Sequence, residues 1–170
     1  MSTAYVTVVE AQAYFEERLH EQAWSIARAS DRPKALLKAT RIIDTLNFAG
    51  CKNAVYVLLE NNPDATPTQI RAAEAAQELE FPRDEDTEVP AEIEQACCEI
   101  AHALLDGVDP DSELENLGIV SQGYASVRTT YNRANVSIEH LMNGVPSATA
   151  WRLLKPFLRD SDAIRLSRVT

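Results

Sequence analysis

The chain has 170 residues, 45% of them hydrophobic, which is enough to bury one core. Its formal net charge is -10 at pH 7, so it repels polyanions and lacks the basic surface expected of a general nucleic-acid binder. The three cysteines, Cys51, Cys97 and Cys98, are odd in number and two are adjacent. This pattern argues against a disulfide framework and fits a reducing cytoplasm.

The first residues predict neither a secretion signal nor a membrane segment. Charged residues interrupt the apolar ones by Glu10, and no later apolar run reaches the ~20 residues that span a bilayer. Charge is distributed unevenly along the chain. Residues 74–115 hold fifteen carboxylates against the single basic residue Arg83, whereas residues 147–170 carry a net charge of +3.

Two amphipathic helices are predicted in the first 50 residues. Thr7 and Glu10 have the spacing of a capping box, and apolar residues then recur at helical spacing, which predicts a helix over 7–19. A second helix is predicted to begin at Ser30 or Asp31, with Pro33 in its first turn, and to stop at Gly50. The side of this helix opposite its apolar face carries Lys34, Lys38 and Arg41.

Two further helices are predicted around a proline corner. Thr66-Pro67 opens a short alanine-rich helix whose small side chains allow close packing, and Phe81-Pro82-Arg83 ends it. A longer helix is predicted from Val89-Pro90 to Asp106-Gly107. Its apolar face is formed by Ile93, Ala96, Cys97, Ile100, Ala101 and Leu104, and its polar face by Glu92, Glu94, Gln95, Glu99 and His102.

The pattern changes after Asp111. Residues 117–131 alternate in polarity, which predicts a short β-hairpin with a turn at Gln122-Gly123. Pro146-Ser147 leads into a short helix that ends near Pro156. The predicted fold is mainly α: a small helical bundle core with a short β-hairpin in one domain over 1–159, and an extended C-terminal tail over 160–170.

The acidic loop offers one possible chemistry. Asp84, Glu85, Asp86 and Glu88 could act as metal ligands or as an acid/base pair. A calcium loop needs ligands at fixed alternate positions and a glycine at its sharp turn, yet no glycine lies between Gly50 and Gly107. We therefore interpret the segment as a solvated acidic loop.

Zinc and nucleophilic chemistry have less support. Cys98 and His102 could share a helix face, but zinc needs three or four clustered ligands and no second pair is near in sequence. The chain also lacks a G-x-S-x-G elbow and a glycine-rich phosphate loop. We expect no enzymatic activity, no catalytic or metal-binding residues and no cofactor.

The order of several segments resembles the head-to-tail adaptor proteins of tailed bacteriophages, also called connector, head completion or neck proteins. The resemblance covers most of the chain and includes an Ala-Thr-x-x-x-Asp helix, a Gly-x-Lys exit, a Pro-Arg corner and a proline-initiated helix. It departs from the family in having Phe81 where many relatives have tryptophan. The segments are Tyr5-Val6-Thr7, Ala13-Tyr14-Phe15, Arg18, Trp24, KALLKATRIIDTLNFAGCK (34–52), LEFPR (79–83), VPAEIEQACCEIAHALLDG (89–107) and GVPSATAWRLLKPFL (144–158).

The resemblance implies a structural virion protein that forms a ring, usually of twelve copies, under the portal protein and joins the DNA-filled head to the tail. Its partners would be the portal, neighbouring copies and a downstream neck or tail protein, after assembly in the bacterial cytoplasm. Two hypotheses for interacting residues follow. Portal or subunit contacts are assigned to Ile164, Arg165, Leu166, Arg168 and Val169 of the tail and to Lys34, Lys38 and Arg41; a DNA-repelling channel surface is assigned to Asp84, Glu85, Asp86 and Glu88.

Two alternative functions remain. Some relatives are described as single-stranded DNA-binding proteins, although basic residues here are outnumbered 16 to 26 and aromatic content is only 6%. A small metal-dependent hydrolase would require a ligand cluster that the sequence does not reveal. Within the adaptor hypothesis, genomic DNA passes through the ring without specific binding.

Overall fold

The computed structural model describes residues 3–117, 121–124, 127–130 and 138–159 and is mainly helical. The region 160–170, with the predicted tail contacts at Ile164, Arg165, Leu166, Arg168 and Val169, lies outside the described residues. The elements are α1 (Val8–Glu16), α2 (Gln22–Ser25), α3 (Arg32–Asp44), α4 (Asn53–Asn61), α5 (Pro67–Ala76), α6 (Ala91–Leu105), α7 (Pro110–Leu117), β1 (Ser121–Tyr124), β2 (Val127–Thr130), α8 (Glu139–Met142), α9 (Ala148–Leu154) and a 3₁₀ turn at Lys155–Phe157.

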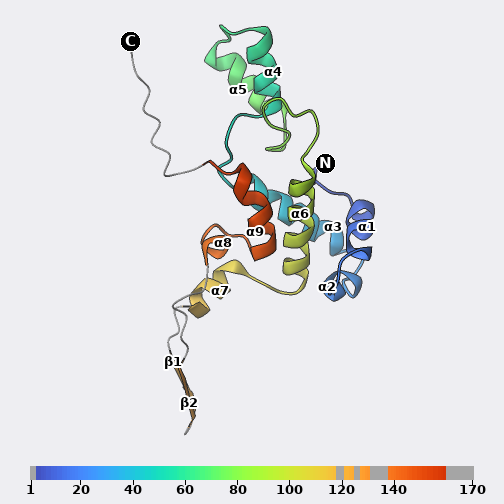
Figure 1. Cartoon of the computed structure of the whole chain (residues 1–170), viewed down its shortest axis with the longest axis vertical. Helices are drawn as coiled ribbons and strands as arrows, with labels where there is room; N and C mark the ends of the chain where they lie inside the picture. Colours follow the sequence, from blue (N-terminus) through green and yellow to red (C-terminus); the bar gives the residue numbers. More distant parts are fainter. Residues whose placement is uncertain (1–2, 118–120, 125–126, 131–137, 160–170) are drawn as a thin grey trace.

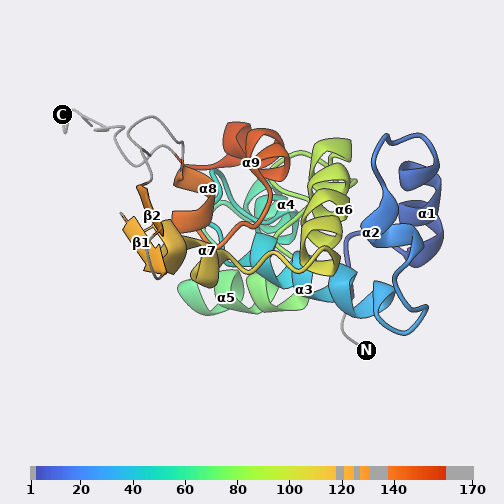
Figure 2. The ribbon, with the colours of Figure 1, turned by 90° about the horizontal axis from the view of Figure 1, so that it is seen from below.

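Three helices form the core. The long helix α6 packs against α3 and also against α9, while α1 and α2 cover one end of this group (Figures 1 and 2). Ile43 of α3 and Ile100 of α6 are both fully buried in one cluster, as expected from the two regular apolar faces. The core therefore joins segments more than 100 residues apart in sequence, from Tyr5 to Leu154.

Local sequence signals explain where several helices begin. Thr7 and Glu10 form the predicted capping box of α1, and Thr66 with Gln69 forms another at the start of α5. Ser147 accepts a hydrogen bond from the Ala150 backbone at the start of α9. The predicted first helix was too long, because α1 ends at Glu16.

Helices α4 and α5 form a helical hairpin, here called the arm (residues 53–76), that projects from one end of the molecule (Figure 1). The two helices pack chiefly against each other. The short helix α5 was predicted to lie against a neighbour, and that neighbour is α4. Helix α4 itself was not predicted, because its sequence NAVYVLLEN has no side-chain cap and few polar residues interrupt its apolar run.

The predicted polar face of α6 was wrong at one position. Glu99 is buried, with only 5% of its surface exposed, because α1 and the chain after it cover this side of the helix. The hydrophobic pattern treated Glu99 as a solvent-facing residue. Its burial requires compensation by partners, which the α1 side supplies.

Strands β1 and β2 pair antiparallel, with Ser121 opposite Thr130 and Tyr124 opposite Val127. Gln122 and Gly123 lie inside β1, so the predicted turn at these residues was wrong. Polarity alternation alone does not fix the register of such a segment. In the described part of the chain, no helix has both the length and the apolar character needed to cross a membrane.

Candidate functional site

The corner at the base of the arm is organised by Arg83. Its guanidinium donates to the backbone carbonyls of Ala49 at 2.9 Å, Gly50 at 3.0 Å and Glu80 at 3.4 Å, and forms an ion pair with the Glu80 carboxylate at 2.6 Å. The side chain is buried and lies over the rings of Phe48 and Phe81. Arg83 therefore fastens the segment that enters the arm to the segment that leaves it.

Backbone pairing strengthens the same corner. Asp84 N–H donates to the Cys51 carbonyl at 2.8 Å, and Asn53 N–H donates to the Pro82 carbonyl at 3.0 Å. The Lys52 ammonium reaches Glu80 at 3.3 Å on the same surface. The base of the arm is consequently a two-stranded clamp and not a free hinge.

A polar network from the N-terminus meets this clamp. The Tyr5 hydroxyl donates to the Asp44 carboxylate and accepts from the Phe81 backbone at 3.3 Å, while Glu80 N–H also donates to Asp44. Burial raises the pKa of Asp44, and the Tyr5 and Glu80 hydrogen bonds oppose that rise. The Ala-Thr-x-x-x-Asp pattern thus has a structural role, because Asp44 joins the end of α3 to the corner.

The acidic loop is less uniform than its sequence suggests. Asp84 is half-buried, and its carboxylate accepts from the Cys51 backbone at 2.9 Å, so the interpretation of a wholly solvated loop was wrong at this residue. Glu85, Asp86 and Glu88 are exposed. Asp84 helps close the clamp, and its three acidic neighbours face solvent.

Acidic side chains from other elements lie near this loop. Burial raises the pKa of Glu94, on the first turn of α6, and the charges of Glu10 and Glu88 raise it further. No group of three or more metal-ligating side chains occurs within the described residues. The arrangement concentrates negative charge without bringing carboxylates together as a ligand set.

The predicted basic face of α3 is present as one exposed surface. Lys34, Lys38 and Arg41 are all exposed, on the side of α3 away from its buried residues. Lys34 pairs with Asp31 at 2.9 Å. Within the described chain, no carboxylate forms an ion pair with Lys38 or Arg41.

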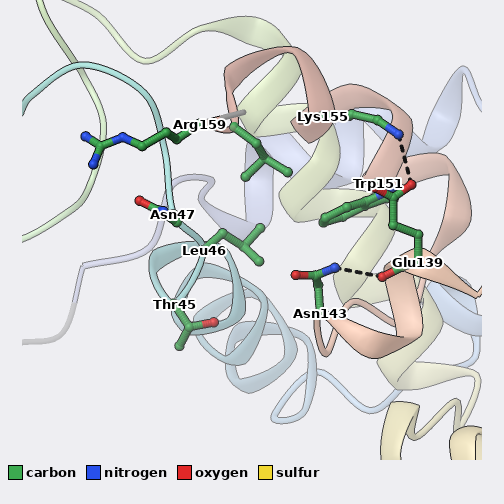
Figure 3. A pocket seen from close by; sticks show the side chains of 9 residues that line it. Thr45, Leu46, Asn47, Glu139, Asn143, Trp151, Lys155 and Arg159 are labelled. Atoms are coloured by element: carbon green, nitrogen blue, oxygen red, sulfur yellow. Dashed lines mark hydrogen bonds and ion pairs between the residues drawn. The ribbon is translucent and has the colours of Figure 1, made fainter. Parts of the chain in front are cut away.

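A hollow lies between the end of α3 and the α8–α9 region (Figure 3). It has a volume of about 650 Å³. Arg159 N–H donates to the Asn47 carbonyl at 2.9 Å, and Ala49 N–H donates to the Phe157 carbonyl at 2.9 Å, so a short antiparallel bridge forms one wall. Its lining residues are Thr45, Leu46, Asn47, Glu139, Asn143, Trp151, Lys155, Leu158 and Arg159.

Two of the charged groups that line this pocket are paired with each other, which favours a role in binding over a role in proton transfer. Its one carboxylate, Glu139, accepts a hydrogen bond from the Lys155 ammonium at 2.9 Å (Figure 3). This interaction lowers the pKa of Glu139. The sequence did not indicate this pocket, because its walls come from three separate segments with no shared motif.

Glu99, Arg18 and Tyr14 form a second polar centre, between α6 and α1. Glu99 accepts from Arg18 Nε at 2.6 Å, from Arg18 Nη2 at 2.9 Å and from the Tyr14 hydroxyl at 2.8 Å. Arg18 also donates to the carbonyls of Leu19 and His20, which ties down the chain after α1. The Tyr14 and Arg18 segments noted in the sequence thus secure the α1 region to α6.

The cysteines and His102 are placed as packing groups. Cys97 and Cys98 are buried and Cys51 is half-buried, and all three are free thiols. Burial raises the pKa of Cys97 to about 11 and also raises that of Cys98, so both stay protonated at neutral pH. Burial lowers the pKa of His102, whose ring packs near Phe15.

The chain matches no protein-family model, no curated protein and no solved structure. The described residues offer interaction surfaces: the arm, the basic face of α3, the exposed acidic residues and the α8–α9 pocket. These surfaces share one framework, which is built from the core helices and the Arg83 corner.

Proposed function

We propose that this protein is a structural virion protein, a head-to-tail adaptor that forms a ring under the portal and leaves a channel open for the genome. The observation that carries the proposal is that the segments resembling the adaptor family meet in one framework. Tyr5 contacts Asp44, Thr40 contacts Cys97 of α6, and Arg83 closes the corner beside them. The resemblance therefore involves residues that depend on one another physically.

Charge supports the same proposal. A net charge of -10 disfavours adhesion of the ring to the phosphate backbone of a passing genome. Glu85, Asp86 and Glu88 are exposed, which is compatible with a place on the channel surface, whereas Asp84 is already engaged in the clamp. The channel-facing hypothesis is therefore retained for the three exposed residues.

The proposed partners are the portal, neighbouring copies in a ring of twelve, and a downstream neck or tail protein. The finer fold proposal is a helical bundle with a β-hairpin around β1 and β2 and an extended tail over 160–170. In this proposal the tail residues Arg165 and Arg168 contact the portal or a neighbouring subunit, and the protein resides in the virion neck after assembly in the host cytoplasm.

Electron microscopy of this protein mixed with the portal ring encoded in the same genome tests the proposal. We expect added density stacked coaxially on one end of the portal, with an open centre. Fluorescence anisotropy with a single-stranded oligonucleotide provides the comparison, and we expect no binding at physiological salt. Absence of portal binding together with micromolar, salt-sensitive DNA binding would favour the DNA-binding alternative.

A further inference from the structure

Few side chains of the arm are buried. In α4 only Val55 is buried, and α5 has no buried residue. Val57 leaves 44% of its surface exposed. Helices of nine and ten residues are marginal without tertiary packing, so a contact on the outer surface of the arm would stabilise it.

The end of the arm is acidic. Between Asn53 and Ile70 the only charged residues are Glu60 and Asp64, and both are exposed. Val57 and Glu60 are three positions apart in α4, so they lie on neighbouring parts of one helix face. The arm tip, defined here as Val57, Glu60 and Asp64, thus combines an exposed apolar side chain with two carboxylates.

The outer face of α3 has the complementary composition. Lys34, Lys38 and Arg41 follow one another at spacings of four and three residues, which places them along one side of the helix. Leu37 is half-buried and lies within one turn of all three. This face, defined as Lys34, Leu37, Lys38 and Arg41, combines a partly exposed apolar side chain with three cations.

We propose that the arm tip of one copy docks on the outer α3 face of a second copy. The proposal rests on the adaptor function above and identifies the surfaces that would join neighbouring subunits in its ring. The two surfaces are different, and the arm projects away from the three-helix core that contains α3 (Figure 1). Such a contact is heterologous, so each copy uses its arm on one neighbour and its α3 face on another, which generates rings or open chains.

The two surfaces contribute different properties to this contact. Val57 against Leu37 supplies apolar burial, while Glu60 and Asp64 opposite Lys38 and Arg41 supply orientation. Exposed ion pairs are individually weak, so the charges mainly select the partner surface and register. The association should consequently weaken with added salt, since the ion pairs at its rim are screened.

Charge reversal in the full-length chain tests this assignment. The arm variant carries Glu60→Lys and Asp64→Lys, and the face variant carries Lys38→Glu and Arg41→Glu. All four side chains are exposed, so the helical circular dichroism spectrum should be unchanged. Sedimentation velocity over a concentration series at about 50 mM and about 500 mM salt measures self-association.

We expect the unsubstituted chain to self-associate at low salt. Each variant alone should self-associate at least about tenfold more weakly. A chain carrying all four reversals restores opposite charges across the contact and should regain association. Glu16→Lys with Glu17→Lys is a matched control, because it makes the same charge change as the arm variant at exposed positions outside both surfaces. It should associate like the unsubstituted chain.

A monomeric unsubstituted chain throughout the series, or a fourfold variant that folds without regaining association, would overturn the assignment. Portal binding separates this result from the proposed function. If the fourfold variant regains self-association but the protein does not bind the portal, the contact between arm tip and α3 face is supported and the adaptor function is rejected. Portal rings decorated by a protein that shows no charge rescue would leave the adaptor standing and reject this contact.

Discussion

Replacing Arg83 should loosen the base of the arm and lower global stability. Its guanidinium is buried and bridges the Ala49 and Gly50 carbonyls while pairing with Glu80. Arg83→Ala leaves those acceptors without their charged donor. Hydrogen bonds to charged groups contribute about 1.5–3 kcal/mol each and are not additive, so we expect a loss of about 3–4 kcal/mol.

The conservative variant separates charge from shape. Arg83→Lys keeps a cation near Glu80, but one ammonium cannot reproduce the planar fork that reaches two carbonyls from a stacked position over Phe48 and Phe81. We expect it to recover about half of the loss. A lysine that restores full stability would show that charge alone matters at this corner.

Urea denaturation followed by circular dichroism measures these free energies, and hydrogen exchange locates the change. Faster exchange should appear first at the Asn53 and Asp84 amides, which pair across the clamp. Arg152→Ala is the control, because Arg152 is exposed and its guanidinium donates to the Ala148 carbonyl of its own helix at 3.3 Å. If both alanine variants lie within ~0.5 kcal/mol of the unsubstituted chain, the clamp does not stabilise the fold.

Three further substitutions test the core and the corner by the same denaturation measurement. Ile100→Ala should cost about 2–5 kcal/mol, because the side chain is fully buried, and a loss under ~0.5 kcal/mol would contradict that burial. Gly50→Ala should cost more than Gly144→Ala: both glycines have positive φ, but a Cβ at Gly50 would collide with the Asp84 carboxyl group while one at Gly144 meets nothing within 4 Å. Equal losses at the two glycines would show that the collision is relieved at no cost.

Long periodic segments made the core predictable from sequence. The helices α3 and α6 have regular apolar faces, so their existence and their buried apolar residues follow from helical spacing. Helix α4 was missed because its apolar residues surround the helix without a cap or a clear polar face. Short elements such as α2 and α8, of four residues each, are too short to show a periodic spacing of apolar residues.

The site depends on contacts that no local pattern contains. Arg83 binds carbonyls more than 30 residues earlier in the chain, and Arg18 reaches Glu99 across 81 residues. The sequence was interpreted as placing a helix end at Phe81-Pro82-Arg83, which was wrong, because α5 already ends at Ala76. It did not indicate that Arg83 fastens the arm. The basic face of α3 could be predicted, because exposure on one side of a regular helix requires only local geometry.

The Glu99 network predicts a specific response to acid. Burial tends to raise the pKa of Glu99, but hydrogen bonds from Arg18 and Tyr14 outweigh it and hold the pKa below the ordinary value of 4.5. The folded state therefore binds this proton less readily than the unfolded chain does. The resulting stabilisation is present above pH 4.5 and is lost as pH falls through the lowered folded pKa.

Glu99→Gln isolates this contribution, because the amide keeps the shape of the side chain but cannot ionise. We expect the stability difference between the two chains to be largest above the ordinary carboxyl pKa and to shrink on acidification. Asp44 and Glu94 have raised pKa values and act in the opposite direction, but they titrate in both chains and cancel in the difference. Denaturant midpoints measured from pH 7 to pH 3 give that difference, and a gap that stays constant with pH would show that the ionised Glu99 does not hold the α1 region to α6.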